Sequence, residues 1–138
     1  AESLGYDVYD VVVVASLIER EVREDEERPL VASVVYNRLA KGMRLEFCST
    51  VQYILGEPQA VLSIADTKIE SPYNTYLHEG LPPGPICSPG EAAIKAALSP
   101  ENTTYLYFVL KSADGTTHNF SSTYDEFLID KEAYKATL

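Results

Sequence analysis

The stretch from Asp7 to Arg23 constrains the fold most, because its pattern is that of a helix with one buried face. Apolar residues recur there at helical spacing, and Asp7 can cap the helix with Asp10 at the third position. The apolar stripe consists of Val11, Val14, Ala15, Ile18 and Val22. It draws on a run of four valines, which are poor helix formers because their branched side chains restrict rotation. We therefore expect this helix to be held by other elements packed around it.

The rest of the chain predicts further helices separated by stop signals. A second helix carries apolar residues from Leu30 to Leu39. Glycines are expected to end two helices: Gly42 ends the second helix and Gly56 ends a short third one. Serine or threonine residues are expected to cap the starts of the others. These caps are Ser49 or Thr50 for the third helix, Ser63 for a helical turn, Ser88 for the helix that ends ahead of Pro100, and Ser122 with Asp125 for the last helix. Helices are therefore expected to dominate the fold.

One β-hairpin is expected late in the chain. The segment Tyr105–Leu110 is rich in strand formers, Asp114-Gly115 is a typical hairpin turn, and Thr117–Ser121 can pair back. Between Ser71 and Gly90 the chain has five prolines and three glycines, which is the composition of an ordered loop. The predicted class is α+β, mostly helical with a late hairpin.

Size and charge limit the function classes. The chain has 138 residues, enough for one domain, and a net charge of −10. Such an acidic surface repels phosphate backbones and anionic lipids, so it argues against nucleic-acid binding and suits a partner such as a sugar. The longest apolar run, Val11–Ala15, is far shorter than the roughly 20 residues that cross a bilayer. We expect no signal peptide in the polar start of the chain.

Glu19 is the first candidate catalytic residue. One helical turn back lie Ala15 and Ser16, so its carboxyl group is expected beside small and apolar neighbours. A carboxyl group held against an apolar surface has a raised pKa and can donate a proton near neutral pH. The alternative, favoured on periodicity alone, is a solvated glutamate paired with Arg23. Glu21 is expected on another face, among charged residues and in solvent.

The segment Ser71–Tyr76 is a candidate sugar-binding lip. Aromatic rings stack on the apolar faces of pyranoses, and an asparagine amide both donates and accepts hydrogen bonds. An aromatic loop clamped onto the core explains the same residues equally well. His78 and His118 have no partner at metal-ligand spacing, and no glycine-rich phosphate loop occurs in the sequence. We therefore expect no metal site and no cofactor.

Several sequence motifs follow one another along the chain in a fixed order. They are Ala15–Glu21, Val31–Leu39, Gly42–Leu45, Thr50–Tyr53, Ser71–Tyr76, Gly80–Ile86, Pro89-Gly90, Ala92–Ile94 and Tyr105–Val109. Together they resemble the YceG-like family of endolytic murein transglycosylases. The match covers nearly the whole chain and implies one mostly helical, lysozyme-like catalytic domain over residues 1–138.

The resemblance implies cleavage of peptidoglycan between N-acetylmuramic acid and N-acetylglucosamine, with a 1,6-anhydro sugar as the new end. It places the catalytic glutamate at Glu19, which would act as general acid and then as base, so that one carboxyl group suffices. The residues expected around the substrate are Asn74, Tyr73, Tyr76 and Gln52, with Asn37 and Arg38 supporting the site from behind. The alternative is a non-catalytic peptidoglycan-binding or scaffold domain.

The resemblance also implies a cellular context. Family members are anchored at the outer face of the bacterial cytoplasmic membrane by an N-terminal helix and carry a LysM-like region, so this chain is expected to be a fragment without them. The implied partners are peptidoglycan glycan strands and peptidoglycan synthases. The chain reads Glu46-Phe47-Cys48-Ser49 where many relatives read Gln-Ser-Asp-Pro. With Cys87 placed near the same cleft and an oxidising location, we expect a Cys48–Cys87 disulfide.

Overall fold

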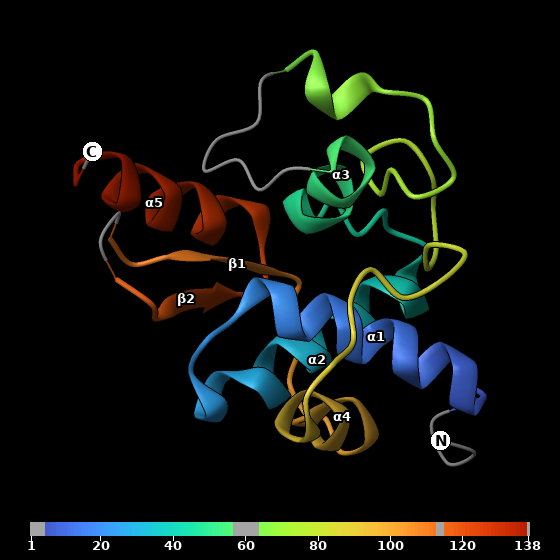
Figure 1. The fold of residues 1–138 in the computed structure, drawn as a ribbon. Coiled ribbons are helices and arrows are strands. Elements are labelled where there is room, and N and C mark those ends of the chain that lie inside the picture. The colour runs from blue at the N-terminus through green and yellow to red at the C-terminus, as the bar shows by residue number, and fades with distance from the viewer. Residues whose placement is uncertain (1–4, 57–63, 113–114, 138) are drawn as a thin grey trace.

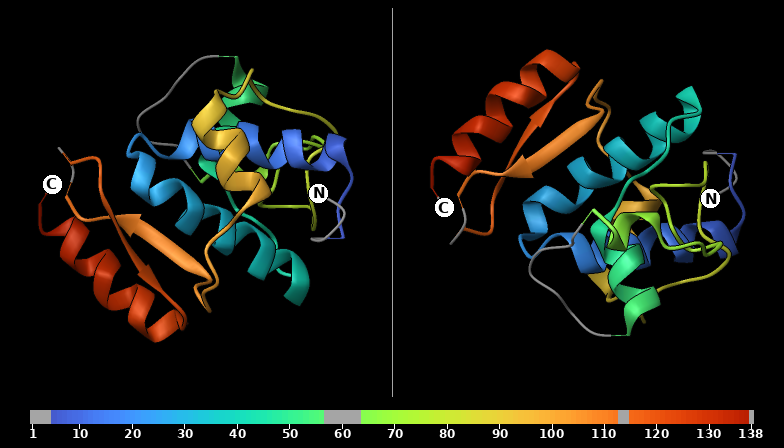
Figure 2. Two further views of the ribbon diagram at one scale, coloured as in Figure 1. Left: turned by 90° about the horizontal axis from the view of Figure 1, so that it is seen from below. Right: turned by 90° about the horizontal axis from the view of Figure 1, so that it is seen from above.

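The computed structural model describes residues 5–56, 64–112 and 115–137. It is an α+β domain, as predicted, with helices around a buried central helix and one small two-stranded sheet. Figure 1 shows α1 and α2 in the middle of the molecule, α4 below them and α3 above. In both views of Figure 2 the hairpin and α5 stay together on one side of this helical core.

The central helix α1 spans Val8–Glu21 and contributes a large share of the core. Asp7 caps it by accepting a hydrogen bond from the Asp10 backbone N–H over 2.8 Å, as predicted. The helix ends at Glu21, two residues before the predicted end, because Val22 already has an extended backbone. Its buried face is also broader than the predicted stripe, since Val13 and Leu17 are enclosed as well.

The helix α2 spans Arg28–Lys41 and follows a 3-10 turn, η2, at Asp25–Glu27. It stops as predicted at Gly42, whose φ of 69° is the left-handed conformation that glycine adopts without strain. The next helix, α3, spans Cys48–Leu55 and ends as predicted at Gly56. Both α2 and α3 contact α1.

Three of the predicted caps are displaced. Phe47, not Ser49 or Thr50, precedes α3, because the Ser49 hydroxyl group bonds to another helix. Gly90, not Ser88, precedes α4, which spans Glu91–Leu98. Thr123 caps α5, Tyr124–Lys135, in a capping box with Glu126, one residue after the predicted Ser122. A 3-10 turn, η3, spans Asp66–Lys68, and its predicted cap Ser63 lies outside the described residues.

The predicted hairpin is present. Strand β1, Tyr107–Leu110, pairs antiparallel with β2, His118–Ser121, and the register sets Leu110 opposite His118. The predicted turn residue Asp114 lies outside the described residues. Helix α5 covers the hairpin. Within the described part of the chain, we find no helix with the length and apolar character of a membrane span.

Candidate functional site

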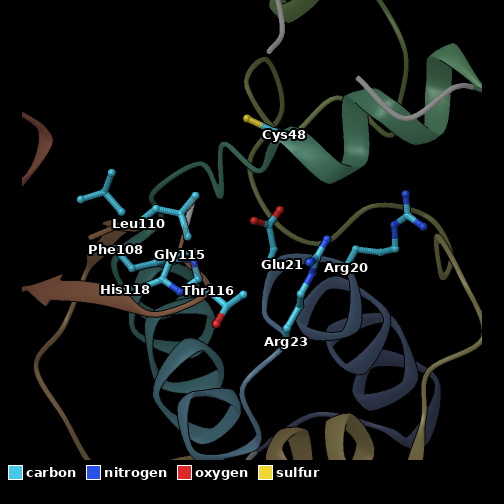
Figure 3. A pocket seen from close by; sticks show the side chains of 10 residues that line it. Arg20, Glu21, Arg23, Cys48, Phe108, Leu110, Gly115, Thr116 and His118 are labelled. Atoms are coloured by element: carbon cyan, nitrogen blue, oxygen red, sulfur yellow. The ribbon is translucent and has the colours of Figure 1, made fainter. Parts of the chain in front are cut away.

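A pocket of about 550 Å³ opens where the end of α1, the start of α3 and the hairpin meet. Figure 3 shows Glu21 in its middle, between Arg20 and Arg23 on one side and His118 on the other. The pocket is lined by Arg20, Glu21, Arg23, Cys48, Phe108, Val109, Leu110, Gly115, Thr116 and His118. One acidic group therefore faces basic, apolar and hydroxyl-bearing side chains in a space large enough for a sugar unit.

Glu21 reaches the pocket because it is the last residue of α1. Its Oε1 accepts hydrogen bonds from the Ser49 hydroxyl group over 2.7 Å and from the Ser49 backbone N–H over 3.4 Å. Burial raises the pKa of Glu21 above its usual range and outweighs the lowering effect of the two hydrogen bonds from Ser49. A carboxyl group with a raised pKa can keep a proton to donate near neutral pH. The expectation that Glu21 is solvated is wrong, because the helix ends before its side chain can join the charged face.

Glu19 lies outside the pocket, on a different face of α1, because residues two apart point to different sides of a helix. Its Oε1 accepts a hydrogen bond from the Gly90 backbone N–H over 2.6 Å, and its Oε2 lies 3.6 Å from Arg28 Nη2. A Cβ atom at Gly90 would come within 2.9 Å of Glu19 Oε1, so the close approach depends on glycine. The carboxyl group of Glu19 thus has polar partners. It has neither the apolar surroundings of the first expectation nor the ion pair with Arg23 of the second. These contacts tie the start of α4 to α1.

The structure places Asn74 inside the loop that carries it. The residue is completely buried, its Nδ2 donates to the carbonyl oxygens of Thr67 and Ile69, and its Oδ1 accepts from the Tyr76 backbone N–H. Every polar group of its side chain has a partner in the protein. This arrangement favours the clamped-loop interpretation of Ser71–Tyr76 over a sugar-binding role for Asn74.

The other residues predicted around the substrate lie near the pocket to different degrees. The Tyr76 hydroxyl group is 3.1 Å from the sulfur of Cys48, a pocket residue, and burial raises the pKa of Tyr76. The Tyr73 ring packs against Tyr53 at a centroid distance of 5.0 Å. Gln52 lies on α3, and none of the three predicted residues belongs to the pocket lining. Tyr76 therefore contacts the pocket wall directly, through Cys48.

Asn37 and Arg38 hold backbone segments that shape the pocket. Asn37 Nδ2 donates to the carbonyl oxygens of Thr103 and Tyr105, both at 2.9 Å. Arg38 donates to three carbonyl oxygens, at Leu106 ahead of β1 and at Arg44 and Leu45 ahead of α3. Neither side chain lines the pocket. They hold the segments that lead into β1 and α3, two elements that line the pocket, and their supporting role stays a prediction.

The predicted Cys48–Cys87 disulfide is absent, and both cysteines are free thiols. Cys48 contacts Tyr76 at the pocket, whereas the Cys87 thiol donates to the Ser16 carbonyl oxygen over 3.4 Å. The two sulfur atoms therefore have separate partners on different elements.

Two reactive thiols are expected in unreduced, denatured protein. A thiol-reactive chromophore should report both groups, and reduction beforehand should not raise the number. Cys48→Ser is expected to remove one of them. A finding of no reactive thiols before reduction, with two afterwards, would show that the cysteines pair.

The raised pKa of Glu21 predicts a pH dependence of stability. At a pH below the pKa of Glu21 in the unfolded state, Glu21 is protonated in both the folded and the unfolded state, so its ionisation does not change the free energy of unfolding. As pH rises towards the higher folded pKa, only the unfolded state loses its proton, so the free energy of unfolding falls. Each unit of raised pKa corresponds to about 1.4 kcal/mol. Glu21→Gln should therefore melt higher than the parent protein at pH 7 and lose this advantage at pH 4, as thermal melts by circular dichroism would measure.

Sequence reasoning missed Glu21, Ser49 and the pairing of His118 with Glu27. Glu21 lies in the same motif as Glu19, but helical periodicity extended to Arg23 assigns it to the wrong face. His118 looks isolated in the sequence because its partner is 91 positions away. In the part of the chain that the structure describes, no group of three or more His, Cys, Asp or Glu side chains is arranged to hold a metal ion.

Fold and pocket together define a mostly helical α+β domain with a partly buried glutamate at the end of its central helix. The profile of the YceG-like family matches residues 1–133. The chain therefore belongs to the YceG-like family. Over 93% of its length it is also similar to a crystal structure of a YceG-like protein from Listeria monocytogenes, with 41% identity and a TM-score of 0.84, and it covers 40% of that chain.

Two curated relatives carry the name endolytic murein transglycosylase. The protein of Bacillus subtilis (strain 168) is 43% identical over 127 residues, which is 92% of this chain and 35% of the relative. The protein of Streptococcus pneumoniae serotype 2 (strain D39) is 36% identical over 122 residues, 85% of this chain and 22% of the relative. The chain thus spans about a third or less of the length of these relatives.

Proposed function

We propose that this domain cleaves peptidoglycan glycan strands as a lytic transglycosylase, with Glu21 as its acid. The observation that carries the proposal is the buried carboxyl group of Glu21 in the middle of the pocket, held by Ser49 and with its pKa raised by burial. The names of the relatives support the reaction class, since both are endolytic murein transglycosylases.

The reaction begins with protonation of the glycosidic oxygen. Glu21 donates its proton to the oxygen that links N-acetylmuramic acid to N-acetylglucosamine while the bond from this oxygen to C1 breaks. The C6 hydroxyl group of the muramyl residue then attacks C1, and the ionised Glu21 carboxylate accepts the hydroxyl proton. The products are a new N-acetylglucosamine end and a 1,6-anhydro-muramyl end, with no water consumed. One carboxyl group serves both steps, unlike the two of ordinary glycosidases.

The sequence resemblance predicts Glu19 for this role, and the geometry favours Glu21. A proton donor must reach the bond that breaks, and Glu21 lines the pocket whereas Glu19 lies outside it. Glu19 is also held by Gly90 and Arg28, which suits a structural contact between α1 and α4. Location at the outer face of the membrane, an anchor beyond this fragment and synthase partners follow from the resemblance and stay predictions.

Mass spectrometry of purified glycan strands incubated with the protein tests the reaction. Internal fragments that end in the anhydro form, one water lighter than hydrolysis products, are the expected result. Reducing-end products would make the domain a hydrolase and overturn the mechanism. Binding without any cleavage, by this fragment and by the full-length protein, would favour the scaffold alternative.

A further inference from the structure

A buried pair, His118 and Glu27, forms part of the pocket wall and has no role in the proton transfers assigned to Glu21. His118 Nδ1 lies 2.8 Å from Glu27 Oε1, and the His118 backbone N–H donates to Glu27 Oε2 over 2.9 Å. The side chains are only 7% and 8% exposed. Glu27 at the end of η2 therefore holds the ring of His118, the first residue of β2, in one orientation.

This pairing determines what the other ring nitrogen can do. A carboxylate only accepts hydrogen bonds, so the hydrogen of the neutral ring lies on Nδ1 and Nε2 presents a lone pair. Within the described residues Nε2 has no hydrogen-bond partner, and His118 lines the pocket together with Glu21. An acceptor held in this way suits a substrate group that offers an N–H or O–H.

The proposed reaction, on which this inference rests, creates such a donor. The bond that breaks and the anhydro bond that forms lie on the same face of C1, so two successive displacements are needed. Among the described residues of the pocket lining, Glu21 has the only carboxyl group. The intermediate nucleophile then has to come from the sugar, whose 2-acetamido carbonyl oxygen can reach C1, as in substrate-assisted glycosidases.

We propose that His118 Nε2 accepts a hydrogen bond from the 2-acetamido N–H of the muramyl residue, and that it stabilises the positive charge that develops on this group during the reaction. As the bond from C1 to the leaving oxygen breaks and that oxygen takes the Glu21 proton, the acetamido oxygen bonds to C1. The positive charge falls on the ring that forms, and its N–H donates to His118. Attack by the C6 oxygen then breaks this bond, and the C6 proton returns to Glu21.

Substrate and protein are varied together to test the proposal. kcat and KM are measured separately for the wild-type protein and for His118→Ala, on strands with N-acetylated and with de-N-acetylated muramyl residues. A hydrogen bond to a developing charge predicts a loss of about 10- to 100-fold in kcat on N-acetylated strands. De-N-acetylated strands keep an N–H but have no acetamido oxygen to bond to C1, so no charge develops on their nitrogen during the reaction. On these slowly reacting strands the loss of kcat should stay within about twofold. Equal losses on both substrates would show a structural role and overturn the proposal.

Three further measurements keep the result unambiguous. His78→Ala is the matched control, since His78 also pairs with a glutamate, Glu70, at 3.0 Å, but is exposed and outside the pocket lining. Glu27→Gln should act in the same direction as His118→Ala, because the ring loses the partner that sets its tautomer. His118→Gln should recover part of the loss, because the glutamine amide oxygen can accept the same hydrogen bond. Thermal melts check that each variant folds.

Failure of the proposed function would give a different result: the Glu21→Gln variant would still cleave the strands. The comparison of the two substrates is made with Glu21 intact, so it tests the role of His118 separately.

Discussion

Glu21→Gln is expected to lower the rate of glycan-strand cleavage by about 10²- to 10⁴-fold, the contribution of a general acid. Glutamine keeps the size of the side chain and its hydrogen bond from Ser49, but it cannot give up a proton to the glycosidic oxygen. Binding of the strands should persist, since Arg20, Arg23 and the hairpin wall are unchanged. Release of anhydro fragments, followed by mass spectrometry over time, measures the effect.

Glu19→Gln is the matched control for this prediction. It makes the same chemical change two residues earlier on the same helix, and its amide oxygen can still accept the hydrogen bond from Gly90. Only its ion pair with Arg28 is lost, and the Glu19 side chain is 31% exposed, so solvent already screens this pair. The activity of Glu19→Gln should stay within about threefold of the wild-type protein. The reverse pattern, with Glu19→Gln inactive and Glu21→Gln active, would restore the role that the resemblance assigns to Glu19.

Asn74→Ala is expected to lower the free energy of unfolding by about 3 kcal/mol, from three hydrogen bonds of about 1 kcal/mol each. The change leaves the carbonyl oxygens of Thr67 and Ile69 and the Tyr76 N–H without the side-chain partner that they have now. Chemical denaturation monitored by circular dichroism measures the loss. Well below the unfolding midpoint, the affinity for glycan strands should be unchanged.

The exposed residue Asn102 provides the comparison for Asn74. Asn102→Ala should change stability by less than about 0.5 kcal/mol, because surface substitutions of this kind remove little. A sugar-binding lip predicts the opposite behaviour of Asn74→Ala, with nearly full stability and a clear loss of affinity. The two measurements together therefore decide between a structural and a substrate-binding asparagine.

Much of the local structure follows from the sequence. The cap at Asp7, the helix ends at Gly42 and Gly56 and the late hairpin are all where the sequence predicts them, because each depends on neighbouring residues in the chain. At two of the displaced caps the serine hydroxyl group has a partner that the fold brings near. Ser49 bonds to Glu21, 28 residues away, and Ser122 bonds to Thr104, 18 residues away.

The candidate site could not be found from the sequence, because it results from two structural features that the spacing of apolar residues does not reveal. Helix α1 ends at Glu21, and this turns the Glu21 side chain towards α3 and the hairpin instead of along the helix surface. His118 acquires a role only through Glu27, which the fold brings to it from another element. The disulfide prediction failed for a similar reason, since Cys48 and Cys87 each face a different partner.

The sequence by itself determined the α+β class, the buried central helix and the family, because apolar spacing, turn residues and ordered motifs are written along the chain. Only the tertiary structure decided which of two glutamates faces the pocket, which histidine belongs to a buried pair with a carboxylate, and that Asn74 is buried. Those properties depend on contacts between residues far apart in the sequence, and on the burial that such contacts create. Local patterns carry no information about either.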